Sequence, residues 1–215
     1  MDFSGLQSKL LSAMNPYILG ITGTMGAGKS TATRIFEKLG AIRISADELA
    51  RFYTSHESPI KNELVEIFGD SVLDPTGTPD RKFISSVVFQ NKEKLQALTE
   101  IIHPRVRQKA LDIIQMSPGE AFIAWEVPLL FESGTYKFCT GTLCVWIDTE
   151  LAKERVIQRD GITEEEFRNR IKNQMDIKEK MKRSEFLIEN NGTELNLEIQ
   201  CRELFTQINR KRGIS

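Results

Sequence analysis

The sequence predicts an α/β fold built on a parallel sheet, and three observations support this prediction. A compact apolar run over residues 17–22 precedes a glycine-rich stretch and then a segment with apolar residues at helical spacing. A second apolar run over residues 41–44 completes a strand–loop–helix–strand unit, which joins parallel strands through a helix that covers the sheet. Apolar runs continue to alternate with helical patterns toward the carboxyl end, so four or five strands are expected.

The first predicted unit contains two strands and the helix between them. Tyr17–Thr22 is predicted as a buried strand, because a short apolar run is typical of a strand covered on both faces. Lys29–Leu39 is predicted as a helix, and Gly40 stands where a glycine commonly closes one. Ala41–Ile44 is the second strand.

The middle of the chain, from about residue 48 to residue 116, has a helical pattern. Breaks are expected at Pro59, at Asp74–Gly77 and at His103-Pro104, because proline lacks the amide hydrogen that a helix uses.

The carboxyl-terminal part is predicted to return to strands that alternate with helices. Thr163 and Glu166 have the spacing of a capping box, in which each side chain bonds the other residue's amide at a helix start. The expected strands are 121–125, 142–147 and 186–188, and the other expected helices are 150–160 and 195–208.

Composition and charge exclude several classes of protein. The 215 residues include 29 Lys and Arg against 30 Asp and Glu, and a net charge of −1 argues against a general binder of nucleic acid or anionic membranes. The longest apolar runs have the length of strands, so no membrane span is expected. Residues 1–15 lack the basic start and long apolar stretch of a secretion signal. Three cysteines without a CxxC pair fit a reducing, cytoplasmic location.

The most informative motif is Gly23–Ser30, which fits the pattern G-x-x-x-x-G-K-[ST] of a phosphate-binding loop. Glycines at these positions let successive backbone N–H groups point inward toward phosphate oxygens, at the positive end of the following helix. Lys29 is suited to reach the β- and γ-phosphates, and the Ser30 hydroxyl is suited to Mg²⁺. The position of the motif between a predicted strand and a predicted helix supports binding of a nucleoside triphosphate.

Asp47 is the best candidate for the acid that receives a proton from an acceptor hydroxyl. It follows the second predicted strand, and ligands of open α/β sheets bind beyond the carboxyl ends of strands. Its position in Ser45–Glu48 is equally compatible with a helix N-cap.

Further candidates follow two other elements, and each has two interpretations. Glu126 ends an apolar strand, where it either holds the water shell of a metal ion or satisfies backbone groups before Pro128. Arg155 and Arg159 are four residues apart, so they share a helix face that either closes over a triphosphate or faces solvent.

Several separated motifs, from about Tyr17 to about Phe205, resemble the dephospho-coenzyme A kinase family. A phosphate-binding loop is common to many NTPases, whereas Val127–Glu132, which reads V-P-L-L-F-E, is specific when it follows His103-Pro104. The matching segments are Gly20–Thr31, Ile44–Arg51, Asp80-Arg81 with Val88-Phe89, Ile102–Pro104, Glu126–Glu132, Arg155–Gly161, Gln174 and Ile188–Gly192.

The resemblance implies a P-loop nucleoside-triphosphate hydrolase fold of the nucleoside-kinase kind, with a five-stranded parallel sheet flanked by helices. A helical domain for the acceptor and a lid are expected to accompany this core. The implied boundaries are an extension over 1–15, a core over 16–47, 119–148 and 183–215, an acceptor domain over 48–118 and a lid over 149–182.

The resemblance also implies the reaction, in which ATP with Mg²⁺ phosphorylates the ribose 3′-hydroxyl of dephospho-CoA. Asp47, Lys29 and Arg155 are the implied catalytic residues, and Ser30 the implied magnesium ligand, with Asp47 or Glu126 acting through water. His103 has the alternative of an N-cap before Pro104. The implied ATP-binding residues are Gly26, Ala27, Gly28, Lys29, Ser30 and Thr31, and the implied acceptor-binding residues are Asp47, Arg81, His103, Pro128, Leu129, Phe131 and Gln174.

Three departures from the family pattern stand beside this agreement. Ser45 replaces the first acid of the family's D-A-D stretch, and Pro79 replaces the leucine that usually precedes D-R. Lys178 and Lys180 stand where arginine is frequent, so a bidentate phosphate contact is lost there.

The alternative function is that of another small-molecule or nucleoside-monophosphate kinase. A monomer or weak homo-oligomer is expected.

Overall fold

The computed structural model describes residues 15–172 and 174–214 of the chain. The predicted extension over 1–15 therefore lies, apart from Asn15, outside the described residues. The contacts divide the chain into two compact units, Met1–Ser45 with Met116–Ser215 and Ala46–Gln115. Each unit is described by itself.

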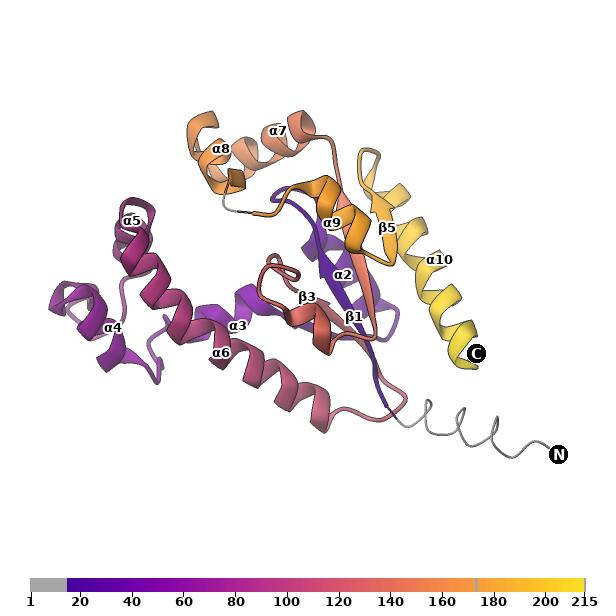
Figure 1. The fold of residues 1–215 in the computed structure, drawn as a ribbon, viewed down its shortest axis with the longest axis horizontal. Coiled ribbons are helices and arrows are strands. Elements are labelled where there is room, and N and C mark those ends of the chain that lie inside the picture. Colours follow the sequence, from indigo (N-terminus) through magenta and orange to yellow (C-terminus); the bar gives the residue numbers. More distant parts are fainter. Residues whose placement is uncertain (1–14, 173, 215) are drawn as a thin grey trace. The chain divides into compact units, whose positions relative to one another are not determined.

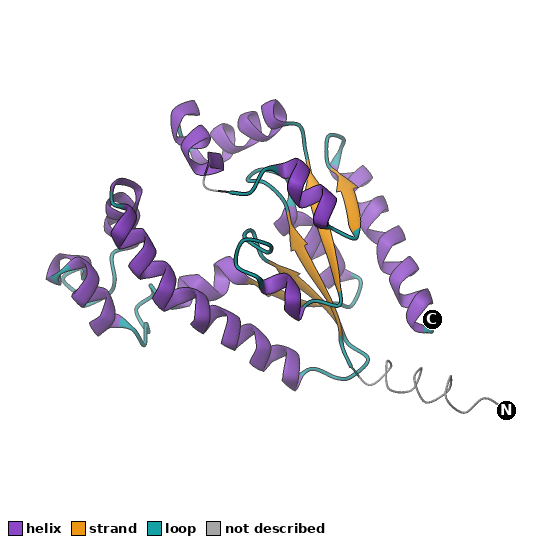
Figure 2. Cartoon of the chain, in the orientation of Figure 1, coloured by secondary structure: helices purple, strands orange, loops and turns teal. Residues whose placement is uncertain are grey.

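The first unit is built on a five-stranded sheet in the order β2-β3-β1-β4-β5. Every neighbouring pair is parallel, and the strands (orange) run in one direction in Figure 2. Glu126 lies opposite both Ile21 and Ser45, so β1, β2 and β3 end at the same edge of the sheet. The strands are β1 (Tyr17–Thr22), β2 (Ile42–Ser45), β3 (Phe122–Glu126), β4 (Gly141–Trp146) and β5 (Phe186–Glu189).

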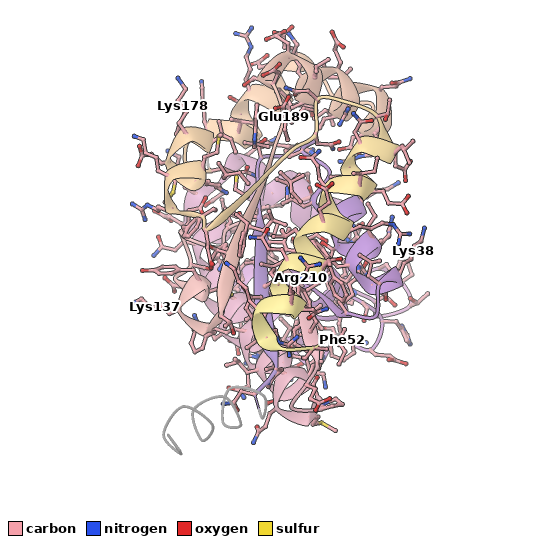
Figure 3. All side chains as sticks on the ribbon, turned by 90° about the vertical axis from the view of Figure 1, so that its right-hand side faces the viewer. Lys38, Phe52, Lys137, Lys178, Glu189 and Arg210 are labelled. Carbon is pink, nitrogen blue, oxygen red and sulfur yellow. The ribbon has the colours of Figure 1, made fainter. Side chains whose placement is uncertain are left out.

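Helices α2 (Lys29–Lys38) and α10 (Glu194–Arg212) pack together and cover one face of this sheet. The rings of Phe36 and Phe122 are stacked with their centroids 5.9 Å apart, and Phe205 of α10 completes this aromatic cluster. Figure 3 shows α10 (yellow) with Arg210 on its solvent side. The amphipathic pattern predicted for these two helices is therefore confirmed, because their apolar faces form the core.

On the other side of β4 lies α9 (Ile177–Arg183), which packs against that strand. Gly20 of β1 also faces this side, where an added Cβ would contact the side chains of Leu130 and Cys139. The segment after β3 contains the short η2 helix (Thr135–Phe138). Both faces of the sheet are thus covered, which explains why its strands read as continuous apolar runs.

Helices α7 (Thr149–Asp160) and α8 (Glu164–Lys172) follow β4 and pack on one another (Figure 1). The predicted capping box is confirmed, because Thr163 N–H donates to Glu166 Oε2 at 2.8 Å and Glu166 N–H donates to Thr163 Oγ1 at 3.2 Å. These reciprocal bonds satisfy amides that a helix start otherwise leaves without partners.

The second unit is helical and has a core of its own. Its apolar side chains come from every element, so the unit does not depend on a single long helix. Its elements are α3 (Ala46–Phe52), α4 (Lys61–Phe68), η1 (Asp70–Val72), α5 (Arg81–Gln90) and α6 (Lys92–Met116). The buried apolar residues that form this core are Tyr53, Ile60, Leu64, Phe68, Val72, Ile84, Ile102 and Val106.

The predicted break at His103-Pro104 is wrong, because α6 continues through Pro104. Ile102 and Val106 are buried on either side of the proline, so core packing on one face outweighs the lost hydrogen bond. In the same turn Arg105 Nη1 donates to the Ile101 carbonyl at 2.9 Å. The N-cap alternative for His103 is wrong for the same reason.

Within residues 15–172 and 174–214, no helix combines the length and the apolar character that crossing a membrane requires.

Replacement of Phe36 by alanine is expected to lower the free energy of unfolding by about 3–5 kcal/mol, because it opens a cavity in the aromatic cluster. Phe36 is fully buried at 0% exposure. Phe138→Ala, at a side chain that is 42% exposed, is the matched control and should change stability by about 0.5 kcal/mol or less. Urea titration measures both, and equal losses in the two variants would contradict the assigned core.

Candidate active site

The predicted phosphate-binding loop joins the end of β1 to the start of α2. Gly26 and Gly28 both have positive φ, 80° and 87°, which side chains rarely adopt. Gly28 is the N-cap of α2, and a Cβ at this position would collide with the Asn190 side chain. Backbone conformation and close packing therefore both require glycine in this loop.

Asn190, which directly follows the edge strand β5, holds this loop in place. It is buried, its Nδ2 donates to the Ala27 carbonyl at 2.9 Å, and its backbone N–H donates to the Trp146 carbonyl at 2.8 Å. The end of β5 is thus tied to both β4 and the loop. The family segment Ile188–Gly192 includes Asn190, but no local sequence pattern indicates which group its side chain binds.

Lys29 is buried within the loop that precedes it, and its Nζ donates to the Thr24 carbonyl at 2.8 Å. The ammonium group is therefore directed back over the loop rather than into solvent. A cation in this orientation can exchange a carbonyl oxygen for a phosphate oxygen without a large change of side-chain position.

Glu126 pairs with the first turn of α2. Ser30 Oγ donates to Glu126 Oε1 at 2.6 Å, although the two residues are 96 positions apart. Glu126 is only 2% exposed, and no described residue provides a hydrogen bond to its buried Oε2. A buried carboxylate oxygen without a donor beside a serine hydroxyl is a suitable pair of oxygen ligands for Mg²⁺, so these residues fit the predicted metal.

A cavity of about 290 Å³ opens beside the loop. Arg155 and Arg159 both line it, which confirms that they share one face of α7. Arg155 Nη2 donates to the Gly192 carbonyl at 3.4 Å, and Arg159 is paired with Asp160 through bonds of 2.7 and 2.8 Å. The lining residues are Gly26, Gly28, Thr31, Arg155, Val156, Arg159, Asn190, Gly192, Glu194 and Leu197.

The segment Pro128–Glu132 follows Glu126 at the same edge of the sheet. The Pro128 carbonyl accepts hydrogen bonds from Thr22 Oγ1 at 3.0 Å and from Lys180 Nζ at 2.7 Å. Leu129 is half-buried, whereas Phe131 is buried with its ring 5.6 Å from that of Tyr136. The backbone of this segment is therefore fixed from two directions.

The segment Pro128–Glu132 has a further contact next to Gln174. Met175 N–H donates to Glu132 Oε1 at 2.8 Å. Gln174 Oε1 is buried and has no hydrogen-bond partner among the described residues. An acceptor atom in this state is suited to a ligand that carries a hydroxyl or amide donor.

The other predicted acceptor residues belong to the second unit. Asp47 is exposed in the first turn of α3, one residue inside the helix, so the N-cap alternative is wrong. Arg81 is exposed at the start of α5, directly after its N-cap Asp80. His103 lies on an exposed position of α6, and desolvation together with the Arg107 guanidinium holds its pKa below the usual value.

Thiol chemistry is not supported at any of the three cysteines. Burial raises the pKa of Cys139 to about 12, of Cys144 to about 11 and of Cys201 to about 12. Such thiols remain protonated near neutral pH, and only the thiolate is an effective nucleophile.

Comparison with known proteins agrees with this geometry. The family model for dephospho-CoA kinase matches residues 17–196. The chain belongs to the dephospho-CoA kinase family. It is therefore a kinase.

Individual relatives extend the likeness over most of the chain. A dephospho-CoA kinase from Leptospira interrogans is 43% identical over 197 residues, which cover 92% of this chain and 95% of that protein. A solved structure from Thermus thermophilus has a TM-score of 0.76 and 32% identity, covering 90% of this chain and 98% of that one. The dephospho-CoA kinase from Campylobacter jejuni has a TM-score of 0.66 and 29% identity, with coverages of 90% and 97%. The predicted P-loop kinase fold is confirmed.

Asn190→Ala is expected to weaken ATP binding about tenfold and to lower the free energy of unfolding by about 1–3 kcal/mol, because it leaves the Ala27 carbonyl without its donor. The affinity loss follows from a less ordered loop. Calorimetric titration with a non-hydrolysable ATP analogue and urea titration measure the two effects. Gln207→Ala, at an exposed position of α10, is the control. Unchanged ATP affinity in Asn190→Ala would show that the loop keeps its conformation without this bond.

Glu132→Gln is expected to be less stable than the wild type at neutral pH, with a difference in Tm that shrinks on acidification. Burial opposes ionisation of Glu132, but hydrogen bonds from Met175 N–H, its own backbone N–H and Lys180 outweigh it and hold the pKa below the ordinary 4.5. Because folding lowers this pKa, the ionised Glu132 stabilises the folded state. This contribution is complete above pH 4.5 and is lost as the pH falls through the lowered pKa.

Thermal unfolding between pH 7 and pH 3 measures this difference, and Glu203→Gln on the exposed side of α10 serves as the control. A difference between wild type and Glu132→Gln that stays constant over the whole range would contradict the ionised pair.

Proposed function

We propose that the chain transfers the γ-phosphoryl group of ATP to the ribose 3′-hydroxyl of dephospho-CoA, giving coenzyme A and ADP in the last step of coenzyme A biosynthesis. The observation that carries the proposal is the phosphate-binding loop with its buried Lys29 beside the Ser30–Glu126 pair, in a chain of this family. A kinase of this type works mainly by positioning and electrostatic stabilisation.

ATP is proposed to bind at the loop between β1 and α2. The amide groups there and the positive end of α2 suit the phosphate oxygens, and Lys29 reaches the β- and γ-phosphates. Arg155, which lines the adjacent cavity, is proposed to cover the developing charge on the transferred group. The ATP-binding residues are Gly26, Ala27, Gly28, Lys29, Ser30 and Thr31.

Ser30 is proposed to hold Mg²⁺ directly, with Asp47 or Glu126 acting through water. When bound, the ion offsets negative charge on the phosphates of ATP. Ser45 replaces the family's first acid and supplies no charge. Glu126, which lies opposite Ser45 in the strand register, provides a carboxylate at this edge of the sheet. Its unpaired Oε2 supports this assignment.

Asp47 is proposed to accept the proton of the 3′-hydroxyl. The hydroxyl oxygen forms a bond to the γ-phosphorus, the bond from that phosphorus to the β,γ-bridging oxygen breaks, and ADP leaves. Asp47 needs only a hydrogen bond to the hydroxyl in the ternary complex, and its exposure allows this contact.

The acceptor is proposed to bind the helical domain over 48–118, while residues 149–182 act as a lid on the core of 16–47, 119–148 and 183–215. The unpaired Gln174 Oε1 supports a donor group of the acceptor at that position. Phe131 is buried and shapes the segment from within. The proposed acceptor-binding residues are Asp47, Arg81, His103, Pro128, Leu129, Phe131 and Gln174.

The enzyme is proposed to work in the cytoplasm as a monomer or weak homo-oligomer. Its only partners are then its substrates, without nucleic acid or membrane, in agreement with the net charge of −1.

ADP release with Mg-ATP tests the reaction when dephospho-CoA, AMP and no acceptor are compared. The expected result is turnover with dephospho-CoA alone and coenzyme A as the second product. Turnover with AMP would favour a nucleoside-monophosphate kinase, and equal rates in all three reactions would reduce the activity to ATP hydrolysis.

Asp47→Asn is expected to lower kcat by about 100-fold or more, because general-base catalysis contributes about 10²–10⁴-fold. ATP affinity and Tm should stay close to the wild type, since the substituted side chain is exposed. Glu48→Gln, at the neighbouring exposed carboxylate of the same helical turn, is the matched control for a change of charge. A wild-type kcat in Asp47→Asn would remove this residue from the mechanism.

A further inference from the structure

Lys180 is a lysine without access to solvent. Its side chain is 0% exposed, although it belongs to α9, a short helix in which Lys178 and Lys182 are exposed. An ammonium group is costly to bury, and lysine is rarely buried without a partner. Its position therefore requires an explanation.

Two oxygen atoms compensate the buried charge. Lys180 Nζ donates to the Pro128 carbonyl at 2.7 Å and lies 3.0 Å from Glu132 Oε1. The Glu132 side chain is only 22% exposed, so solvent screens this ion pair less than a surface pair. Arginine is frequent at this position in the family, but here the Lys180 ammonium is directed to these two protein oxygens.

Each of these two oxygen atoms also binds a second segment. The Pro128 carbonyl accepts from Thr22 Oγ1, which lies at the end of β1 directly before the phosphate-binding loop. Glu132 Oε1 accepts from Met175 N–H, directly after Gln174. Lys180 therefore connects three parts of the chain, the end of β1, the segment Pro128–Glu132 and the segment around Gln174.

We propose that Lys180 and Glu132 are positioning residues that hold Pro128–Glu132 and Gln174 in the arrangement that the acceptor binds. This inference rests on the proposed function, because only that function makes Pro128, Leu129 and Gln174 acceptor residues. Neither Lys180 nor Glu132 needs to touch the substrate. Their effect acts through the backbone they fix.

This arrangement predicts that Lys180 affects acceptor binding and not ATP binding. The bonds of Lys180 order the acceptor segment at both of its ends, Pro128 and Glu132, whereas the phosphate-binding loop has its own support from Asn190. Loss of the ammonium should thus impair acceptor binding and leave ATP binding intact. A role in folding alone would lower Tm without changing either KM.

The experiment compares Lys180→Met, Lys180→Arg and the control Lys182→Met, an exposed lysine of the same helix. KM for dephospho-CoA, KM for ATP, kcat and Tm are measured below the lowest Tm. Lys180→Met should raise the acceptor KM about 10- to 100-fold, the scale that small misplacements of binding groups produce. Its KM for ATP should stay within about twofold. Lys180→Arg should recover most of the loss because it keeps the charge, and Lys182→Met should match the wild type.

Should Lys180→Met not fold, Glu132→Gln provides the second test, because it removes the charge while an amide oxygen remains to accept from Met175 and Lys180. A smaller rise of the acceptor KM alone is expected there. Unchanged acceptor KM in folded variants, or an equal rise of both KM values, overturns the inference while the proposed function stands. Wild-type enzyme without turnover on dephospho-CoA overturns the proposed function and this inference with it.

Discussion

The hydrogen bond from the Asn190 side chain to the Ala27 carbonyl fixes the one loop on which the rest of the site depends. A phosphate-binding loop works only if its amide groups already point toward the phosphates before the ligand arrives. Glycine makes the required backbone conformation accessible, but the same freedom also makes many other conformations accessible to the loop. The contact of Gly28 with Asn190 restricts that freedom, so the residue that permits the shape and the residue that selects it come from opposite ends of the sequence.

The same edge of the sheet gathers the buried charged groups of the first unit. Lys29, Glu126 and Lys180 are its buried charged side chains among the described residues, and each has a partner of complementary chemistry, a carbonyl, a hydroxyl or a carboxylate. Parallel strands explain the location, because their carboxyl ends meet on one side and leave loops rather than strands to supply side chains. Burial strengthens electrostatic interactions there, which benefits a reaction that moves charge between phosphate oxygens.

Different parts of the fold and site were predictable to different degrees. The strands, the glycine-rich loop, the capping box at Thr163 and the shared face of Arg155 and Arg159 depend on residues close in sequence, and all were predicted. The break at Pro104 was predicted wrongly, because burial of Ile102 and Val106 decides whether a helix tolerates a proline and a local pattern does not contain that information. The residue motif of the family could be recognised, but not the atoms to which Asn190, Glu132 and Lys180 are bonded.

The sequence by itself determined the α/β class, the phosphate-binding loop and the family, because short-range patterns of residue type indicate all three. Tertiary structure alone decided which partners those residues meet. Glu126 reaches Ser30 across 96 positions, Lys180 reaches Pro128 across 52, and Asn190 reaches Ala27 across 163. Such contacts depend on strand order and helix packing, which bring distant segments to one edge of the sheet, and no local propensity specifies which distant atoms then come within hydrogen-bond distance.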